Sequence, residues 1–249
     1  MKDTVILPAD ALAAVEDTAL FYPCSGNDWQ APIRLFAPAV TAFWFVDRAY
    51  FPLSRPADTA RPLLHRWPGY EFLEKHLRGP AGAEVQYRVD PITGKRYPDL
   101  EPCVLTERYR HRRSGRVIAV HRRRGYGFSA FRKEITTLGV FFYRGDSQGE
   151  GGSGDLWLKR DHVQEVCAKL VDGGLFATDG SNHLRSREYT ELWRLNTAGR
   201  DLSPAELVQA ARPFTDRTGR RFTCVGVTDD RHGFALIWQV RRPTAAPEC

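Results

Sequence analysis

Apolar and polar positions along the chain follow two different spacings. Helical spacing of apolar residues, as at Leu12, Val15 and Leu20, predicts amphipathic helices. A capping box with Ser203 as N-cap and Glu206 three residues later predicts the start of a helix near the C-terminus. The predicted helices cover residues 9–20, 29–36, about 70–78 and 161–170 and a segment that begins at 203.

Short runs rich in aromatic and β-branched residues predict buried strands, and runs that alternate apolar with polar residues predict half-buried ones. The run FWFVD is typical of the first kind, and RFTCVGVTDD is typical of the second. The predicted strands cover residues 20–22, 43–47, 84–90, 103–111, 116–123, 138–143 and 175–180, followed by a closing pair at 221–230 and 233–243.

The order of these elements predicts the fold class. Strands alternate with helices until the terminal antiparallel pair, which favours an α/β protein with a mostly parallel sheet and helices on both faces. The sequence shows no internal repeat and no linker, so we expect a single domain over residues 1–249. A β-rich insertion at about 52–110 interrupts the alternation.

Two segments of the predicted sheet could bind a ligand at the carboxyl ends of its strands, where such sheets bind ligands. The first strand leads into FYPCSGND, in which Gly26 lets the backbone approach a ligand closely. Asp47 ends the second strand, 21 residues after Gly26. A carboxylate at that place can accept both hydrogen bonds from a ribose diol.

These blocks resemble the class I S-adenosylmethionine-dependent methyltransferases, whose Rossmann-like sheet ends in an antiparallel hairpin. FYPCSGND is similar to the first loop of that family, and FWFVD to its second strand with the ribose-binding acid. RVIAVHRRRGYG resembles the third strand and the loop that faces adenine. LGVFFYRGD, HVQEVCAKLVDGGLFATDG and GFALIWQVRRP resemble the fourth strand, the fifth helix–strand unit and the last strand.

The resemblance implies a Rossmann-like methyltransferase with S-adenosylmethionine as the small-molecule donor. Residues outside about 52–110 carry it, and the insertion would select the acceptor. The acceptor stays open and could be an anionic molecule or a nucleic acid. The donor-binding residues implied are Tyr22, Cys24, Ser25, Gly26, Asn27, Asp28, Asp47, Arg124, Gly125, Tyr126, Tyr143, Arg144 and Asp146.

The sequence also departs from the family pattern. Its first loop has one glycine where the family usually has two or three, and Pro23 removes a hydrogen-bond donor from the strand. The third loop has Gly125, Tyr126 and Gly127 where an acid or amide usually faces adenine. An alternative function is therefore a noncatalytic binding or regulatory module that contacts nucleic acid through an arginine-rich hairpin.

No catalytic base is predicted, because methyl transfer depends mainly on alignment and needs a base only for a protonated nucleophile. His121 is a candidate, although a lone histidine in a strand is more often a packed or surface residue. The glycine-rich stretch at 144–155 could be a lid beside the reacting centre or a polar surface loop.

Composition narrows the classes further. Hydrophobic residues make up 42% and charged residues 27% of the chain, as in a globular protein with a sizeable core. The net charge is +6, and many arginines lie in RYRHRRSGR and HRRR, which could contact phosphates or form a solvated hairpin. Aromatic residues stand among the arginines of the insertion, where they could stack a base or pack against the sheet; they are Trp67, Tyr70, Phe72, Tyr87 and Tyr97.

Five scattered cysteines without a CxxC pair predict neither a disulfide framework nor a zinc site. The N-terminus carries acids and lacks an unbroken apolar stretch, so we expect no secretory signal. No apolar run approaches the ~20 residues that cross a bilayer. These features predict a reduced, cytoplasmic protein without a metal or a membrane partner.

Overall fold

The structure is a computed structural model. It describes residues 4–83, 86–89, 94, 96–99, 101–144, 156–184, 186–199, 201–230 and 233–243.

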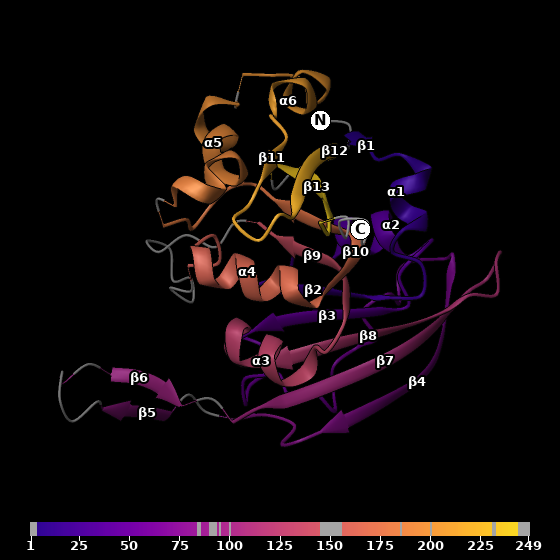
Figure 1. Ribbon diagram of the computed structural model, residues 1–249. Helices are drawn as coiled ribbons and strands as arrows, with labels where there is room; N and C mark the ends of the chain where they lie inside the picture. The colour runs from indigo at the N-terminus through magenta and orange to yellow at the C-terminus, as the bar shows by residue number, and fades with distance from the viewer. Residues whose placement is uncertain are drawn as a thin grey trace, which may run out of the picture.

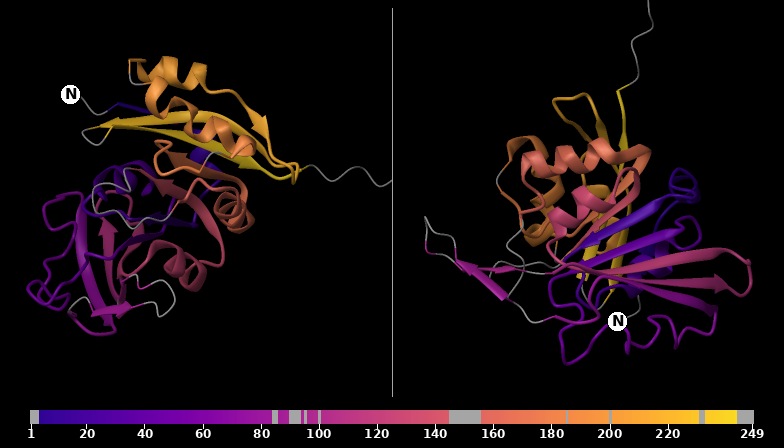
Figure 2. Two further views of the ribbon diagram at one scale, coloured as in Figure 1. Left: turned by 90° about the vertical axis from the view of Figure 1, so that its left-hand side faces the viewer. Right: turned by 90° about the horizontal axis from the view of Figure 1, so that it is seen from below.

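A mixed sheet of eleven strands forms the body of the molecule (Figure 1). Its strands are β1 (Thr4–Ile6), β2 (Ala19–Pro23), β3 (Ala42–Asp47), β4 (Tyr70–Arg78), β7 (Cys103–His111), β8 (Val117–Arg124), β9 (Leu138–Tyr143), β10 (Leu170–Thr178), β11 (Phe214–Thr215), β12 (Arg221–Asp230) and β13 (Gly233–Arg241). Their order is β1-β12-β13-β10-β9-β2-β3-β8-β7-β4, with β11 paired to β12. The sheet twists strongly, so that β12 and β13 run across the direction of β7 and β4 (Figure 2).

The sequence predicts a Rossmann-like, mostly parallel sheet with helices on both faces, and this prediction is wrong. Within the described part of the chain, the main sheet has six antiparallel pairings and four parallel ones. Strands make up 39% of the described residues and helices 23%. Much of the antiparallel part comes from β4 and β7, which extend the main sheet at one edge instead of forming a separate inserted unit.

Strand β4 occupies residues for which the sequence predicts a helix. It pairs antiparallel with β7, and a bulge between Phe72 and Glu74 shifts its register. Before the bulge the apolar residues of the strand are Tyr70 and Phe72, and from the bulge onward they are Leu73 and Leu77. This change of phase gives the apolar residues a spacing that resembles that of a helix. The pattern therefore has a physical origin in an irregular strand.

The middle of the sheet is parallel and determines where chain segments meet. Strands β8, β3, β2, β9 and β10 pair in parallel in this spatial order. The chain passes from β2 to β3 and β8 on one side, and then returns to β9 and β10 on the other. Loops that leave the carboxyl ends of β2 and β9 therefore diverge, which is where a crevice can form at the edge of a sheet.

Both faces of these central strands are buried, which explains their nearly continuous apolar sequences. Phe21 and Phe141 belong to the core on one face, whereas Tyr22 and Phe142 belong to the core on the other. The helices are α1 (Ala9–Ala13), α2 (Gln30–Phe36), α3 (Gly127–Glu134), α4 (Arg160–Lys169), α5 (Thr190–Ala198) and α6 (Pro204–Ala210), with a 3-10 turn η1 (Arg187–Tyr189). Helices α1 and α2 contribute to the second core, and the later helices contribute to the first.

Local signals in the sequence are reproduced at several elements. The capping box of α6 is confirmed, because Ser203 accepts the amide of Glu206 and the Glu206 carboxylate accepts the amide of Ser203. Strand β9 covers the predicted residues 138–143. Helix α1 is shorter than predicted, since a turn with a positive φ at Asp17 separates it from β2.

A small hairpin stands apart from the main sheet. Strands β5 (Gln86–Val89) and β6 (Arg96–Asp99) pair only with each other among the described strands and project from the body of the molecule (Figures 1 and 2). Among the described helices, none has the length and apolar character needed to cross a membrane.

Candidate functional site

The loops that follow β2 and β3 meet at the carboxyl edge of the parallel strands. The amide of Gly26 donates to Asp47 Oδ2 at 2.9 Å, and the amide of Ala49 donates to Asp47 Oδ1 at 2.7 Å. The amide of Ser25 donates to the carbonyl of Val46 at 3.0 Å. Gly26 has a φ of +49°, a conformation that favours glycine. The turn and the acid that the sequence singles out are therefore in direct contact.

Tyr50 covers the contact between Gly26 and Asp47 from one side. The sequence did not predict it as a site residue. Its hydroxyl donates to the carbonyl of Gly26 at 2.7 Å and lies 2.9 Å from Ser25 Oγ. Burial is the main reason that the pKa of Tyr50 is raised, so the hydroxyl stays protonated at neutral pH. Its position only three residues after Asp47 is the one signal that could have identified it.

A cavity of about 630 Å³ opens beside these loops and is called here the Asp47 cavity. Its size lies within the range of small-molecule sites, which is ~300–1,000 Å³. It borders both predicted loops and the segment that follows Asp47. Its lining includes Gly26, Asn27, Asp47, Tyr50, Phe51 and Arg122.

Arg122 gives the Asp47 cavity a cationic wall. Its guanidinium lies 5.3 Å from the centroid of the Phe51 ring, and its Nη2 is 3.2 Å from the carboxylate of Glu107. Burial raises the pKa of Glu107, while the charge of Arg122 opposes this shift. The cavity thus has one side at Asp47, whose carboxylate accepts two backbone amides, and one side at Arg122, whose guanidinium pairs with Glu107.

A buried ion cluster joins the ends of β2 and β9 and is called here the Arg144 cluster (Tyr22, Asp28, Arg144 and Asp230). Arg144 Nε and Nη2 bond the two carboxylate oxygens of Asp28 at 2.9 Å each, and Nη2 also bonds Asp230 at 3.1 Å. The Tyr22 hydroxyl lies 2.8 Å from Asp28 Oδ2 and 3.0 Å from the carbonyl of Arg144. Only 1% of the Arg144 side chain is exposed.

Electrostatics keep Arg144 charged and Tyr22 protonated within this cluster. Burial alone would lower the pKa of Arg144, but the charges of Asp28, Tyr22 and Asp230 together raise it. Burial, followed by the charge of Asp28, raises the pKa of Tyr22 well above its usual value. The arginine is therefore a fixed cation and the tyrosine a fixed hydroxyl donor.

The other predicted donor-binding residues are divided between the site and the core. Asn27 lines the Asp47 cavity, and the amide of Gly125 bonds the carbonyl of Asp47 at 3.2 Å. Arg124 is buried, with its guanidinium bound to the carbonyls of Glu101 and Phe51.

Three further predicted residues lie elsewhere. Tyr143 is fully buried in the core with Trp157, and Tyr126 precedes α3 as its N-cap. Cys24 has a φ of +53° and is partly exposed in the first loop. Asp146 and most of the 144–155 loop lie outside the described residues.

His121 lies on the opposite face of β8 from Arg122, because neighbouring strand residues alternate. It stacks on Trp44 with ring centroids 4.0 Å apart, and its Nδ1 is 2.9 Å from Thr106 Oγ1. Burial lowers its pKa to about 4. The structure therefore places His121 in the packing of the sheet and away from the Asp47 cavity.

The arginine-rich hairpin formed by β7 and β8 is partly neutralised by acids. Arg108 pairs with Glu74 at 2.8 Å, and Arg110 lies 3.5 Å from Glu71, both across the β4–β7 ladder. Both pairs are exposed, so they contribute little to stability. They do reduce the positive field by which the hairpin, judged from its sequence, would attract nucleic acid.

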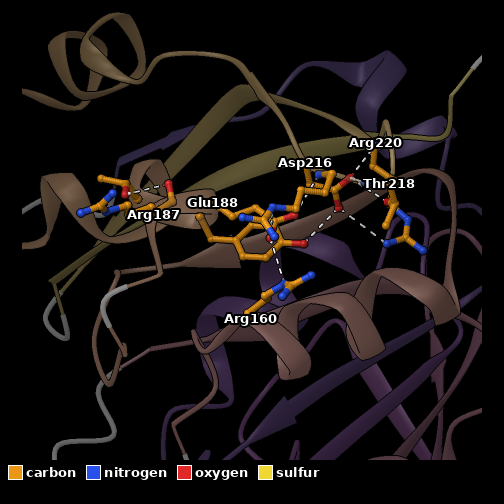
Figure 3. Close-up of polar contacts among 9 residues, drawn as sticks. Arg160, Arg187, Glu188, Asp216, Thr218 and Arg220 are labelled. Carbon is orange, nitrogen blue, oxygen red and sulfur yellow. Dashed lines mark hydrogen bonds and ion pairs between the residues drawn. The ribbon is translucent and has the colours of Figure 1, made fainter.

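A second buried polar cluster lies far from both loops, and is called here the Asp216 cluster (Tyr189, Asp216, Thr218 and Arg220; Figure 3). Asp216 Oδ1 accepts the amides of Thr218 at 2.9 Å and Arg220 at 3.0 Å, and Oδ2 accepts the Tyr189 hydroxyl at 3.0 Å. Burial raises the pKa of Asp216, but these hydrogen bonds outweigh it and lower the pKa overall. Next to this cluster, the carboxylate of Glu188 forms an ion pair with Arg160 at 3.1 Å.

The described residues contain no group of three or more His, Cys, Asp and Glu side chains arranged to hold a metal ion. Comparison of the chain with protein-family models, with curated proteins and with solved structures finds no match.

Proposed function

We propose that the protein binds S-adenosylmethionine in the Asp47 cavity and is a methyltransferase. The observation that carries the proposal is the contact between Gly26 and the carboxylate of Asp47 at the edge of that cavity. Each carboxylate oxygen of Asp47 accepts one backbone amide and keeps a lone pair for a further donor. The two ribose hydroxyls of the donor would supply those hydrogen bonds.

The residues around the cavity fit the rest of such a donor. The planar guanidinium of Arg122, which lies over the buried Phe51 ring, offers a surface on which an adenine ring can stack. The side-chain amide of Asn27 can donate to the carboxylate of the methionine portion. The donor supplies an activated methyl group, and the task of the chain is to orient it and exclude water.

Calorimetric titration tests the binding step. Wild-type protein should bind S-adenosylmethionine and S-adenosylhomocysteine with a Kd below ~1 mM, as expected for a usable substrate. Asp47→Asn keeps the size of the side chain and should weaken both ligands ~10-fold, since one hydrogen bond to a charged group is worth ~1.5–3 kcal/mol.

Asp172→Asn is the matched control for this titration. Asp172 lies near the amino end of β10, where its carboxylate accepts the amide of Arg242 at 2.7 Å. Thermal unfolding confirms that both variants are folded. Absence of binding by folded wild type, or equal affinity in the two variants, would remove the proposal.

A binding module without methyl transfer is the second candidate. The Arg144 cluster favours it, because this cluster places a buried, ion-paired arginine where the strand order reverses. The two candidates separate in one assay, in which the protein is incubated with S-adenosylmethionine and total cellular nucleic acid, protein or metabolites. Production of S-adenosylhomocysteine above a no-protein blank supports the enzyme, and binding without production supports the module.

A further inference from the structure

A second cavity, called here the Trp67 cavity, lies at the opposite edge of the parallel strands. Its volume is about 720 Å³. The end of α2, the start of β4 and the turn between β7 and β8 surround it. The residues that carry the argument are Arg34, Trp67, Tyr70, His111, Ser114 and Arg116. It shares no lining residue with the Asp47 cavity.

Aromatic rings form a continuous wall of this cavity. The Trp67 ring lies 5.8 Å from Trp29 and 6.0 Å from Tyr70, and Tyr70 lies 5.2 Å from His111, all between centroids. Trp67 and Tyr70 are partly exposed, so part of each side chain is accessible to a ligand. Burial raises the pKa of Tyr70, which keeps its hydroxyl as a donor. Such a wall suits a planar ring.

Two arginines, Arg34 and Arg116, place positive charge beside this aromatic wall. The guanidinium of Arg34 lies 6.0 Å from the centroid of Trp67. Arg116 is fixed by Asp17 at 2.8 Å and by the carbonyl of Ala39, and its Nη1 lies 3.8 Å from the carboxylate of Glu16. None of the described residues that line the cavity is an acid. A ligand there meets Arg34 and Arg116 beside a stacking surface, and the acids that pair with Arg116 are not among the lining residues.

We infer that the Trp67 cavity binds a nucleotide, with its base stacked on Trp67 and Tyr70 and its phosphate bound by Arg34 and Arg116. Arginine is the side chain best matched to phosphate geometry, and aromatic side chains stack bases of any sequence. The cavity is large enough for a mononucleotide, since ligand sites span ~300–1,000 Å³. The nucleotide can be free or can be the phosphorylated end of a single strand.

Calorimetry with guanosine monophosphate tests the site. Wild type should bind this probe with a Kd below ~1 mM. Arg34→Gln should weaken it ~10-fold through loss of a charge-assisted hydrogen bond. Trp67→Leu should weaken it ~10-fold through loss of stacking. Inorganic phosphate and guanosine, each with only half of the ligand, should bind more weakly than the nucleotide.

Two control variants locate the effect. Arg108→Gln removes one positive charge from the exposed face of β7, where Arg108 pairs with Glu74, and should leave the affinity unchanged. Asp47→Asn should also leave it unchanged, while Arg34→Gln should leave S-adenosylmethionine binding unchanged. This crossed result makes the nucleotide site independent of the proposed donor site.

A 5′-phosphorylated six-nucleotide deoxyadenylate separates the two sources of the nucleotide. Tighter binding of this strand than of the mononucleotide, again weakened by Arg34→Gln, identifies a strand end; the reverse order identifies a free nucleotide. The inference is overturned if folded wild type binds neither probe, if inorganic phosphate binds as tightly as the nucleotide, or if Arg34→Gln and Arg108→Gln have equal affinities.

Discussion

The Arg144 cluster and the Asp216 cluster use the same groups in different ways. Each holds a buried carboxylate, an arginine and a tyrosine hydroxyl. Arg144 joins residues that are 116 and 86 positions away from it in the sequence. Asp216 instead accepts hydrogen bonds mainly from residues two and four positions later. The first cluster fastens several strand ends together, whereas the second closes one turn.

This difference shows that a buried charged residue does not by itself mark a functional site. The Asp216 carboxylate is saturated by backbone amides and by Tyr189, and its role is complete within the turn. The Arg144 cluster lies at the carboxyl edge, where Asp28 follows Asn27 of the Asp47 cavity. Contact between segments far apart in sequence, next to a cavity, is the more informative sign.

Removal of Arg144 should have the largest effect on folding. Arg144→Met leaves Asp28 and Asp230 buried without their cation and should lower the free energy of unfolding by ~3–5 kcal/mol. Arg220→Met is the matched change in the other cluster, where the arginine lies 3.6 Å from Asp216 and the carboxylate keeps its amide donors. It should cost ~1 kcal/mol or less. Urea denaturation measures both, and an equal loss in the two variants would break the comparison.

Removal of the Asp216 carboxylate should have the next largest effect. Asp216→Ala takes away the acceptor for Thr218, Arg220 and Tyr189 together and should lower the free energy of unfolding by ~2–3 kcal/mol. Binding of S-adenosylmethionine by the folded fraction should not change, because the cluster is remote from the Asp47 cavity. A loss of affinity at a temperature where the variant is folded would contradict the purely structural role.

The sequence predicted those features that depend on neighbouring residues. The capping box of Ser203 and Glu206 forms as predicted, since both partners lie within one helical turn. The contact between Gly26 and Asp47 also follows from the order of the strands, because Asp47 ends β3 and Gly26 lies in the loop after its parallel neighbour β2. Periodicity failed at β4, where a bulge changes the phase of the strand and imitates a helix.

The rest of the site depends on contacts between distant segments. Nothing near Arg144 in the sequence indicates that Asp28 and Asp230 will surround it. The Trp67 cavity likewise needs α2 to lie against the β7–β8 turn, which composition and periodicity cannot predict. The mostly antiparallel sheet was missed for the same reason, since pairing partners are not written in a strand's own pattern.

The two tyrosines allow a finer comparison of the clusters. Tyr22→Phe removes a hydroxyl that contacts Asp28 and the carbonyl of Arg144, and Tyr189→Phe removes one that contacts Asp216. Each change should cost ~1–1.5 kcal/mol, the value of one buried hydrogen bond. Paired urea titrations measure the costs. If Tyr22→Phe were silent, the Tyr22 hydroxyl would contribute nothing to the Arg144 cluster and the cluster would be smaller than defined.

The loss of stability at acid pH should be the smallest of these effects. It should come from His121, which lies outside both clusters. Burial lowers the pKa of His121 from 6.5 to about 4 in the folded chain. Between these values the unfolded state binds more protons, so stability is complete above pH ~6.5 and is lost as the pH falls toward 4.

From pH 7 to pH 5, His121 should therefore cost on the order of 1 kcal/mol, which is less than the full linkage value because the ring is partly exposed. His121→Gln should make the stability profile shallower over this range, and the same change at the exposed His65 serves as the control. Urea midpoints at pH 5, 6 and 7 measure the profile. An unaltered slope in His121→Gln would mean that the proton uptake occurs elsewhere, and would direct attention to His162, whose pKa burial also lowers to about 4.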